Sequence, residues 1–292
     1  MNLAILRQFS AAEYFYLARA YVTAKVSPQS LPPEGDRGLV AANLFGHAIA
    51  AGWSLRREGN NNHISLTESG TELNFQIRRG TTDANVFSQV FRYMEYGPVV
   101  SLYRKKFGQQ ATRIIDAGGN AGFASLYFGA NFPQAKIVTL EIEAGNYMAM
   151  TDNFKSNPAL DIVPQLRGLW YNNDVLSVNT SFRAGGEYAF SVLPNDDVAK
   201  DLDQHIRGMT VQDIVAEHFG GQMIDILKID IEGAEKYLFQ DEALALEFLA
   251  MTKFLALEIH DDVADRQYIR QILAKANMDW IDEQETTVAW HR

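Results

Sequence analysis

The fold of this chain is decided by the stretch Ile114-Ile-Asp-Ala-Gly-Gly-Asn-Ala-Gly-Phe-Ala-Ser-Leu-Tyr-Phe-Gly-Ala-Asn-Phe132. A β-branched run ends in a carboxylate, and a glycine-rich turn then opens an amphipathic helix. This order is typical of an α/β sheet that builds a pocket for a nucleoside-bearing cofactor. The glycines allow close approach of the backbone, and the turn lies at a helix N-terminus, whose free N–H groups attract negative charge.

The residues of the turn distinguish between two cofactor classes. The spacing Asp116-x-Gly118-x-Asn120-x-Gly122 differs from the G-x-G-x-x-G pattern that admits a pyrophosphate. An acidic residue before the turn would repel a pyrophosphate, whereas it would suit the ammonium group of an amino-acid moiety, directly or through water. The sequence therefore favours S-adenosylmethionine over NAD. A tight strand-to-helix connection without a ligand is the alternative for this motif taken alone.

A second acidic strand end supports a bound nucleoside. The next predicted strand, Lys136-Ile-Val-Thr-Leu-Glu141, ends in a carboxylate 19 residues beyond Gly122. Ribose hydroxyls are held at about this place in nucleotide-binding βαβ units, so we predict that Glu141 binds the ribose. Asp116 and Glu141 then mark the C-terminal ends of consecutive strands, the edge of an open sheet where ligands bind.

A related pattern recurs about a hundred residues later, in Asp225-Ile-Leu-Lys-Ile-Asp-Ile-Glu-Gly-Ala-Glu235. If this strand is regular, alternation places Lys228, Asp230 and Glu232 on one face. We count these three residues among the catalytic candidates. A structural alternative is a buried Lys228 paired with one carboxylate, because buried charges require partners.

Together these motifs resemble the FkbM-type methyltransferases. The resemblance rests on residues 114–122, on Glu141 followed by Asn146 and Asn153, and on residues 227–235, with further support from Arg79-Gly-Thr-Thr-Asp-Ala-Asn-Val-Phe-Ser-Gln-Val-Phe and Leu257-Glu-Ile-His260. It implies an S-adenosylmethionine-dependent methyltransferase of the Rossmann-like class. Such enzymes typically methylate a hydroxyl of a sugar, a polyketide or a related natural product. The predicted cofactor-binding set is Asp116, Gly118, Asn120, Gly122, Phe123, Glu141, Ile142, Asn146 and Trp170. Trp170 could stack on adenine, and the alternative is a core or rim position.

Length and composition bound the remaining possibilities. The chain has 292 residues, 47% hydrophobic residues, a formal net charge of -10 and no cysteine. This suits one α/β domain with a smaller appendage, and the acidic balance argues against nucleic acid and suits a sulfonium cofactor. The absence of cysteine fits a reducing cytosol, and no apolar run approaches the ~20 residues that span a bilayer. We expect a cytoplasmic protein that binds no membrane.

We expect two domains, residues 1–80 and residues 81–292. The first is predicted as an α+β appendage, with helical sequence over 4–26, a linker over 28–36, a helix near 39–51 and alternating strands joined by a turn at Ser69-Gly70. We expect this appendage to act as a lid, to contact the substrate or to form a dimer contact. The second begins with a helix over 86–96 and contains a seven-stranded methyltransferase sheet with an antiparallel C-terminal hairpin. Its predicted strands span 112–116, 136–141, 161–166, 224–230, 253–259, 278–282 and 286–291, and residues 170–203 are expected to be irregular or to add strands near the pocket.

Transfer of a methyl group to a hydroxyl requires a base, because the hydroxyl proton must leave as the new bond forms. We predict that His260, at the end of the strand beside that of Asp230, is this base, and that Glu232, in preference to Glu258, orients its imidazole. The alternative is a hydrogen-bonded structural histidine. A second alternative is an oxygen-rich divalent-metal site, formed by Asp230, Glu232, His260, Asp261 and Asp262. Asp261 and Asp262 could equally cap the following helix.

Two rival functions follow from the same residues. One is a nicotinamide-dependent oxidoreductase, and the other is a catalytically silent module that binds the cofactor within a biosynthetic assembly. The expected partner of the enzyme is a small hydroxylated acceptor. The sequence leaves a homodimer open.

Overall fold

The computed structural model describes residues 37–108, 110–179, 191–194 and 205–292. The predicted helix over 4–26 and the linker over 28–36 lie outside the described residues. Among the described residues, every helix is too short or too polar to cross a bilayer.

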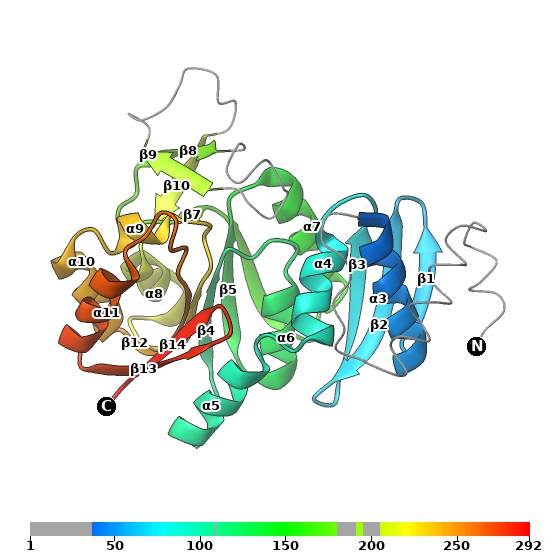
Figure 1. Cartoon of the computed structure of the whole chain (residues 1–292), viewed down its shortest axis with the longest axis horizontal. Helices are drawn as coiled ribbons and strands as arrows, with labels where there is room; N and C mark the ends of the chain where they lie inside the picture. Colours follow the sequence, from blue (N-terminus) through cyan, green and yellow to red (C-terminus); the bar gives the residue numbers. More distant parts are fainter. Residues whose placement is uncertain (1–36, 109, 180–190, 195–204) are drawn as a thin grey trace.

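A seven-stranded sheet forms the centre of the molecule (Figure 1), with the strand order β13-β14-β12-β11-β4-β5-β6. Its strands are β4 (Arg113–Ala117), β5 (Lys136–Glu141), β6 (Asp161–Leu166), β11 (Ile224–Ile229), β12 (Thr252–Glu258), β13 (Met278–Glu283) and β14 (Thr286–His291). Strand β14 pairs antiparallel with both β12 and β13, while the neighbouring pairs from β12 to β6 are parallel. The Rossmann-like methyltransferase sheet with its terminal hairpin is thereby confirmed.

Helices cover both faces of this sheet, so its central strands are buried on both sides. Strand β11 is buried at every position. Ile226 contributes to one hydrophobic core and the adjacent Leu227 to the other, as alternation in a strand requires. The first core receives α5 (Gly97–Phe107), α6 (Phe123–Asn131) and α7 (Ala144–Lys155), and the second receives α8 (Val211–Phe219), α10 (Glu242–Ala250) and α11 (Arg266–Lys275).

The helix after β12, α11, begins at Arg266. Its N-cap is Asp265, whose carboxylate accepts hydrogen bonds from the backbone N–H groups of Gln267 and Tyr268. Asp261 instead pairs with Arg266. The alternative in which Asp261 and Asp262 cap this helix is therefore excluded.

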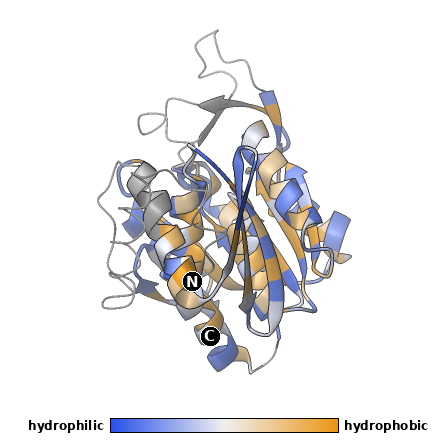
Figure 2. Cartoon of the chain, turned by 90° about the vertical axis from the view of Figure 1, so that its right-hand side faces the viewer, coloured by the Kyte–Doolittle hydropathy of each residue, from blue (hydrophilic) through white to orange (hydrophobic). Residues whose placement is uncertain are grey.

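The N-terminal appendage consists of α3 (Arg37–Ala51) and the antiparallel strands β1 (Ser54–Glu58), β2 (Asn61–Glu68) and β3 (Thr71–Arg78). Hydrophilic and hydrophobic residues alternate along its strands (Figure 2), and β2 and β3 bury every second residue. Ser69 and Gly70 both have positive φ, which matches the predicted hairpin turn.

Strand β3 is joined to the main domain through two asparagines at the end of α7. The side-chain oxygen of Asn153 accepts from the backbone N–H of Gln76, and that of Asn157 accepts from the N–H of Asn74. Phe75 and Phe123 belong to the same hydrophobic core. The appendage therefore packs as part of the main domain, while its predicted role as a lid, a substrate-binding element or a dimer contact stays a prediction.

The segment before the sheet differs from the expected helix over 86–96. The structure has α4 (Asp83–Phe87), a π-helical turn η1 (Ser88–Arg92) and a break at Met94, whose φ is 57°, before α5 begins at Gly97. Residues 168–209 contain a small second sheet of β7 (Gly168–Leu169), β8 (Val175–Asn179), β9 (Ser191–Pro194) and β10 (His205–Met209). This agrees with the expectation of extra strands there.

Candidate functional site

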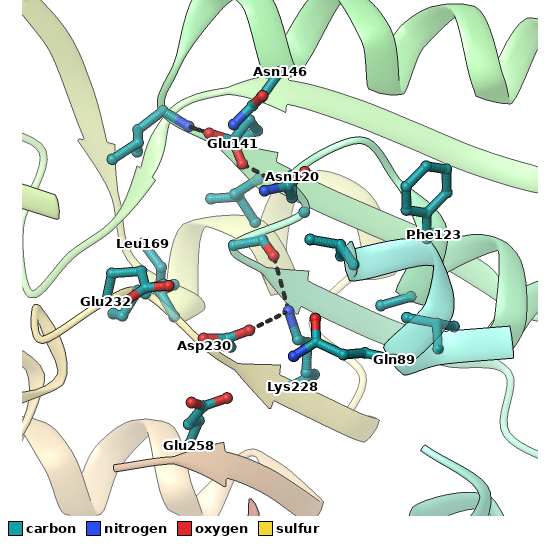
Figure 3. A pocket seen from close by; sticks show the side chains of 18 of the residues that line it. Gln89, Asn120, Phe123, Glu141, Asn146, Leu169, Lys228, Asp230, Glu232 and Glu258 are labelled. Atoms are coloured by element: carbon teal, nitrogen blue, oxygen red, sulfur yellow. Dashed lines mark hydrogen bonds and ion pairs between the residues drawn. The ribbon is translucent and has the colours of Figure 1, made fainter. Parts of the chain in front are cut away.

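A cavity of about 500 Å³ lies at the C-terminal ends of the parallel strands. Figure 3 shows Asn120, Glu141 and Asn146 together at one end, and Asp230, Glu232 and Glu258 at the other. The cavity therefore has two chemically different ends. We refer to them as the amide end and the acidic end.

The glycine turn after β4 lies against the end of β11. Gly118 has φ of 83°, and a Cβ added there would lie 1.7 Å from the backbone oxygen of Asp230. A Cβ on Gly119 would lie 2.4 Å from the side chain of Thr139. Both glycines line the cavity, so the backbone itself forms this part of its wall.

Glu141 organises the amide end. Its carboxylate accepts hydrogen bonds from the backbone N–H groups of Asn120, Ile142 and Glu143 at 2.7, 2.9 and 2.8 Å. Burial raises the pKa of Glu141 to about 7, although these hydrogen bonds act in the opposite direction. The carboxylate is thus held rigidly at the cavity wall, where a ribose could donate its hydroxyl hydrogens. Asn146 and Phe123 line the same end.

Lys228 connects the glycine turn with the acidic end. It is the register neighbour of Asp116 across β11 and β4. Its Nζ lies 3.0 Å from Asp116 Oδ1 and 3.5 Å from Asp230 Oδ2, and it donates to the carbonyl oxygen of Gly118 at 2.8 Å. Burial would lower the pKa of Lys228, but the adjacent carboxylates of Asp116 and Asp230 outweigh it and raise the pKa. Lys228 is therefore a buried amine held between two carboxylates.

His260 lies behind the acidic end rather than on its surface. Its side chain is 3% exposed, and Nδ1 lies 3.1 Å from Oε1 of the buried Glu235. Its Nε2 lies 3.4 Å from Glu232 Oε2 and 3.5 Å from Glu258 Oε1. Burial lowers the pKa of His260, but the hydrogen bond to Glu235 and the surrounding carboxylates dominate and raise it.

Most of the residues predicted for the site line this one cavity. They are Gly118, Asn120, Phe123, Glu141, Ile142, Asn146, Lys228, Asp230 and Glu232. Four predicted residues do not line it. Asp116 is fully buried and binds Lys228 and Ser125, Gly122 packs against Phe154, and Trp170 packs against Tyr171 and Tyr237. The fourth is His260. Asp116 and Trp170 do not line the cavity, and their predicted roles in binding the cofactor stay predictions.

Sequence reasoning missed two carboxylates that line the cavity, Glu95 and Glu285, and it did not assign Glu235 to the imidazole. Glu95 follows the π-helical turn and is half-buried. Burial, followed by repulsion from Asp230, raises the pKa of Glu95 to about 7. The sequence motif over residues 79–91 could have indicated that this segment forms part of the cavity wall. Four of its residues line the cavity, namely Asn85, Val86, Gln89 and Val90.

Sequence comparisons relate part of this chain to known methyltransferases. Residues 170–278 match the family described as the methyltransferase FkbM domain. The chain is 29% identical over 150 residues to methyltransferase sdnD of Sordaria araneosa, and the match covers 42% of this chain and 57% of that protein. The predicted resemblance to the FkbM-type methyltransferases is thereby confirmed for residues 170–278, and the match supports the predicted cofactor, S-adenosylmethionine.

Solved structures give weaker likenesses. Monomeric WbdD has a TM-score of 0.41 at 10% identity, covering 68% of this chain and 41% of that chain. The plantazolicin methyltransferase BpumL in complex with SAH has a TM-score of 0.40 at 10% identity, covering 71% and 87%. Likenesses at this level carry no conclusion about the ligands of this chain.

Proposed function

We propose that this chain transfers the methyl group of S-adenosylmethionine to a hydroxyl group of a small-molecule acceptor. The observation that carries the proposal is the single cavity with an amide end beside the glycine turn and an acidic end beside β11 and β12. Bound at the amide end, the cofactor would supply an activated methyl group. The transfer is an in-line displacement, so alignment of the two reactants and exclusion of water supply much of the rate.

The residues of the amide end fit the proposed cofactor. The rigid carboxylate of Glu141 can accept hydrogen bonds from ribose hydroxyls, and its three backbone partners fix its orientation. The glycines of the turn carry no side chain, so the ligand can approach the backbone there. The acidic end, by contrast, suits the positive charge of the cofactor's methionyl part.

We assign proton removal from the acceptor to Glu95 rather than to His260. Glu95 lines the cavity, whereas Glu232 and Glu258 stand between the cavity and the imidazole. A carboxylate whose pKa is about 7 can accept a proton efficiently near neutral pH. His260 then acts through the carboxylates that it positions.

Replacement of Glu95 by Gln is expected to lower kcat about a hundredfold while leaving the Kd for S-adenosylhomocysteine unchanged. Gln keeps the shape of the side chain but accepts no proton. Because the base must be deprotonated, kcat of the unmodified enzyme should rise with pH through about 7, and this rise should be absent in the variant. Glu72→Gln on the exposed face of β3 is the control. Equal pH profiles for Glu95→Gln and the unmodified enzyme would exclude Glu95 as the base.

The function itself is tested with the full chain. Calorimetry should show binding of S-adenosylmethionine and S-adenosylhomocysteine but not of NADH. Labelled-methyl transfer should then be measured against sugars, polyketides and peptides. Stabilisation by NADH alone would favour the nicotinamide-dependent oxidoreductase. Tight cofactor binding without transfer to any acceptor would favour the silent module in a biosynthetic assembly.

A further inference from the structure

The acidic end brings together three groups of a kind that bind metal ions. Asp230, Glu232 and His260 each offer one ligand atom, and these atoms all lie within 4.8 Å of one another. Asp230 and Glu232 follow β11, and His260 follows β12, so the parallel pairing of the two strands brings them together. Two carboxylates and an imidazole form a mixed oxygen and nitrogen ligand set.

The orientation of the buried imidazole points to the same centre. A carboxylate only accepts hydrogen bonds, so Nδ1 of His260 carries the proton that it shares with Glu235 at 3.1 Å. Glu235 is itself fixed, because it accepts from the backbone N–H of Ile231 at 3.1 Å and is fully buried. Nε2 is therefore directed at Glu232 and Glu258. A histidine whose second nitrogen donates to a buried carboxylate is the usual arrangement around a bound metal.

The distances around Nε2 also fit ligands of a shared ion. Glu232 Oε2 and Glu258 Oε1 lie 3.4 and 3.5 Å away, beyond the usual range of about 2.7–3.2 Å for an N–H···O hydrogen bond. Two ligands bound side by side to one ion at about 2.0–2.6 Å lie about 3 to 3.5 Å apart. Nε2 of His260 and Oε2 of Glu232 thus have the spacing of neighbouring ligands, and one ligand atom each of Asp230, Glu232 and His260 lie within 4.8 Å of one another.

The charge balance of the acidic end favours a cation. Asp230, Glu232, Glu258, Glu95 and Glu285 all line the cavity, and the positive charge of Lys228 is shared between Asp116 and Asp230. The like charges of these carboxylates repel one another across the cavity. A divalent ion would offset this repulsion.

We propose that Asp230, Glu232 and Nε2 of His260 bind one divalent ion of the Mn²⁺ class at the acidic end of the cavity. Carboxylates alone would suit Mg²⁺ or Ca²⁺, and the imidazole shifts the preference toward a transition metal. The role of the ion rests on the proposed function: placed beside the acceptor, it would lower the pKa of the hydroxyl that is methylated. Glu235 is a positioning residue, because it acts through His260.

The test uses the full chain, stripped with EDTA and dialysed, and titrated with MnCl₂. Loss of the electron paramagnetic resonance signal of free Mn²⁺ should show one bound ion per chain. His260→Ala and Glu232→Gln should each weaken Mn²⁺ binding at least tenfold, and Glu235→Gln should weaken it about tenfold. His63→Ala is the matched control, because His63 also lies near a carboxylate, Glu58, but on the appendage. Circular dichroism and calorimetry with S-adenosylhomocysteine verify that each variant is folded.

The outcomes separate this proposal from the proposed function. One bound ion that is lost in His260→Ala and Glu235→Gln but kept in His63→Ala supports the site. Absence of Mn²⁺ binding, or equal binding by all variants, overturns the metal site. Methyl transfer at full rate in EDTA excludes a role of the ion in the reaction and leaves the methyltransferase function intact. Failure to bind S-adenosylmethionine would instead overturn the function, while the Mn²⁺ titration would still decide the site.

Discussion

Replacement of Gly118 by Ala is expected to destabilise the protein by about 4 kcal/mol or more and to abolish binding of S-adenosylhomocysteine. A Cβ at this position would lie 1.7 Å from the backbone oxygen of Asp230, and the alanine would also have to adopt φ of 83°. The contacted atom belongs to the backbone, so a change of rotamer cannot relieve the overlap. The ends of β4 and β11 would have to separate, and both carry residues of the site.

Urea denaturation followed by circular dichroism measures the loss of stability, and Gly80→Ala provides the control. Gly80 has φ of 78°, nearly the same as Gly118, but nothing lies within 4 Å of a Cβ added there. The control should therefore lose only about 1 kcal/mol, the cost of left-handed backbone for alanine. Equal losses in the two variants would show that the close approach to Asp230 is not what requires glycine.

The main sheet could be predicted from the sequence because its strands carry unambiguous patterns. Strand β11, Ile224-Asp-Ile-Leu-Lys-Ile229, is apolar at four of its six positions, which favours a strand buried on both faces. The last two strands, β13 and β14, lie too close together in the chain for an intervening helix. Their antiparallel pairing follows from chain length alone.

The segment before the sheet could not be predicted in the same way. Residues 86–96 have helical spacing, but the chain forms a π-helical turn and then a left-handed residue at Met94. Local propensity does not reveal such a break, because tertiary packing of Phe87 and Phe91 against Phe75 stabilises it. The position of Glu95 at the cavity depends on this break, which is why Glu95 was missed.

Within the site, the sequence identified the strand ends but not the direction of each side chain. Alternation placed Lys228, Asp230 and Glu232 on one face, yet β11 ends at Ile229, and Glu232 and Gly233 have φ of 53° and 88°. This left-handed turn brings Glu235 into contact with the imidazole of His260. Regular alternation along a strand would not have predicted that contact. Asp116 likewise lies at a strand end but faces Lys228 instead of the cavity.

Replacement of Lys228 by Met is expected to destabilise the protein by about 3–5 kcal/mol. Met has a similar length and no charge, so the variant removes the ion pairs while retaining most of the packing. Asp116 would then remain fully buried without its cation, 3.0 Å from where Nζ had been. The carbonyl oxygen of Gly118 would also lose its donor. Lys253→Met is the control, because Lys253 is partly exposed and its partner Asp225 keeps hydrogen bonds from Thr112 and Arg113.

A double-mutant cycle separates the ion pair from packing, because Asp116→Asn removes the buried charge that Lys228→Met leaves without a cation. The double variant should be more stable than Lys228→Met alone, with a coupling free energy of about 1–3 kcal/mol measured by urea denaturation. Additive losses would mean that Lys228 stabilises the fold through its aliphatic chain and not through Asp116. If coupling is found, the same cycle measured on the Kd for S-adenosylhomocysteine shows whether the pair also holds the glycine turn in its binding conformation. We expect the affinity to fall in Lys228→Met and to stay low in the double variant, since the introduced asparagine side chain cannot replace the donor that Lys228 offers to the carbonyl oxygen of Gly118.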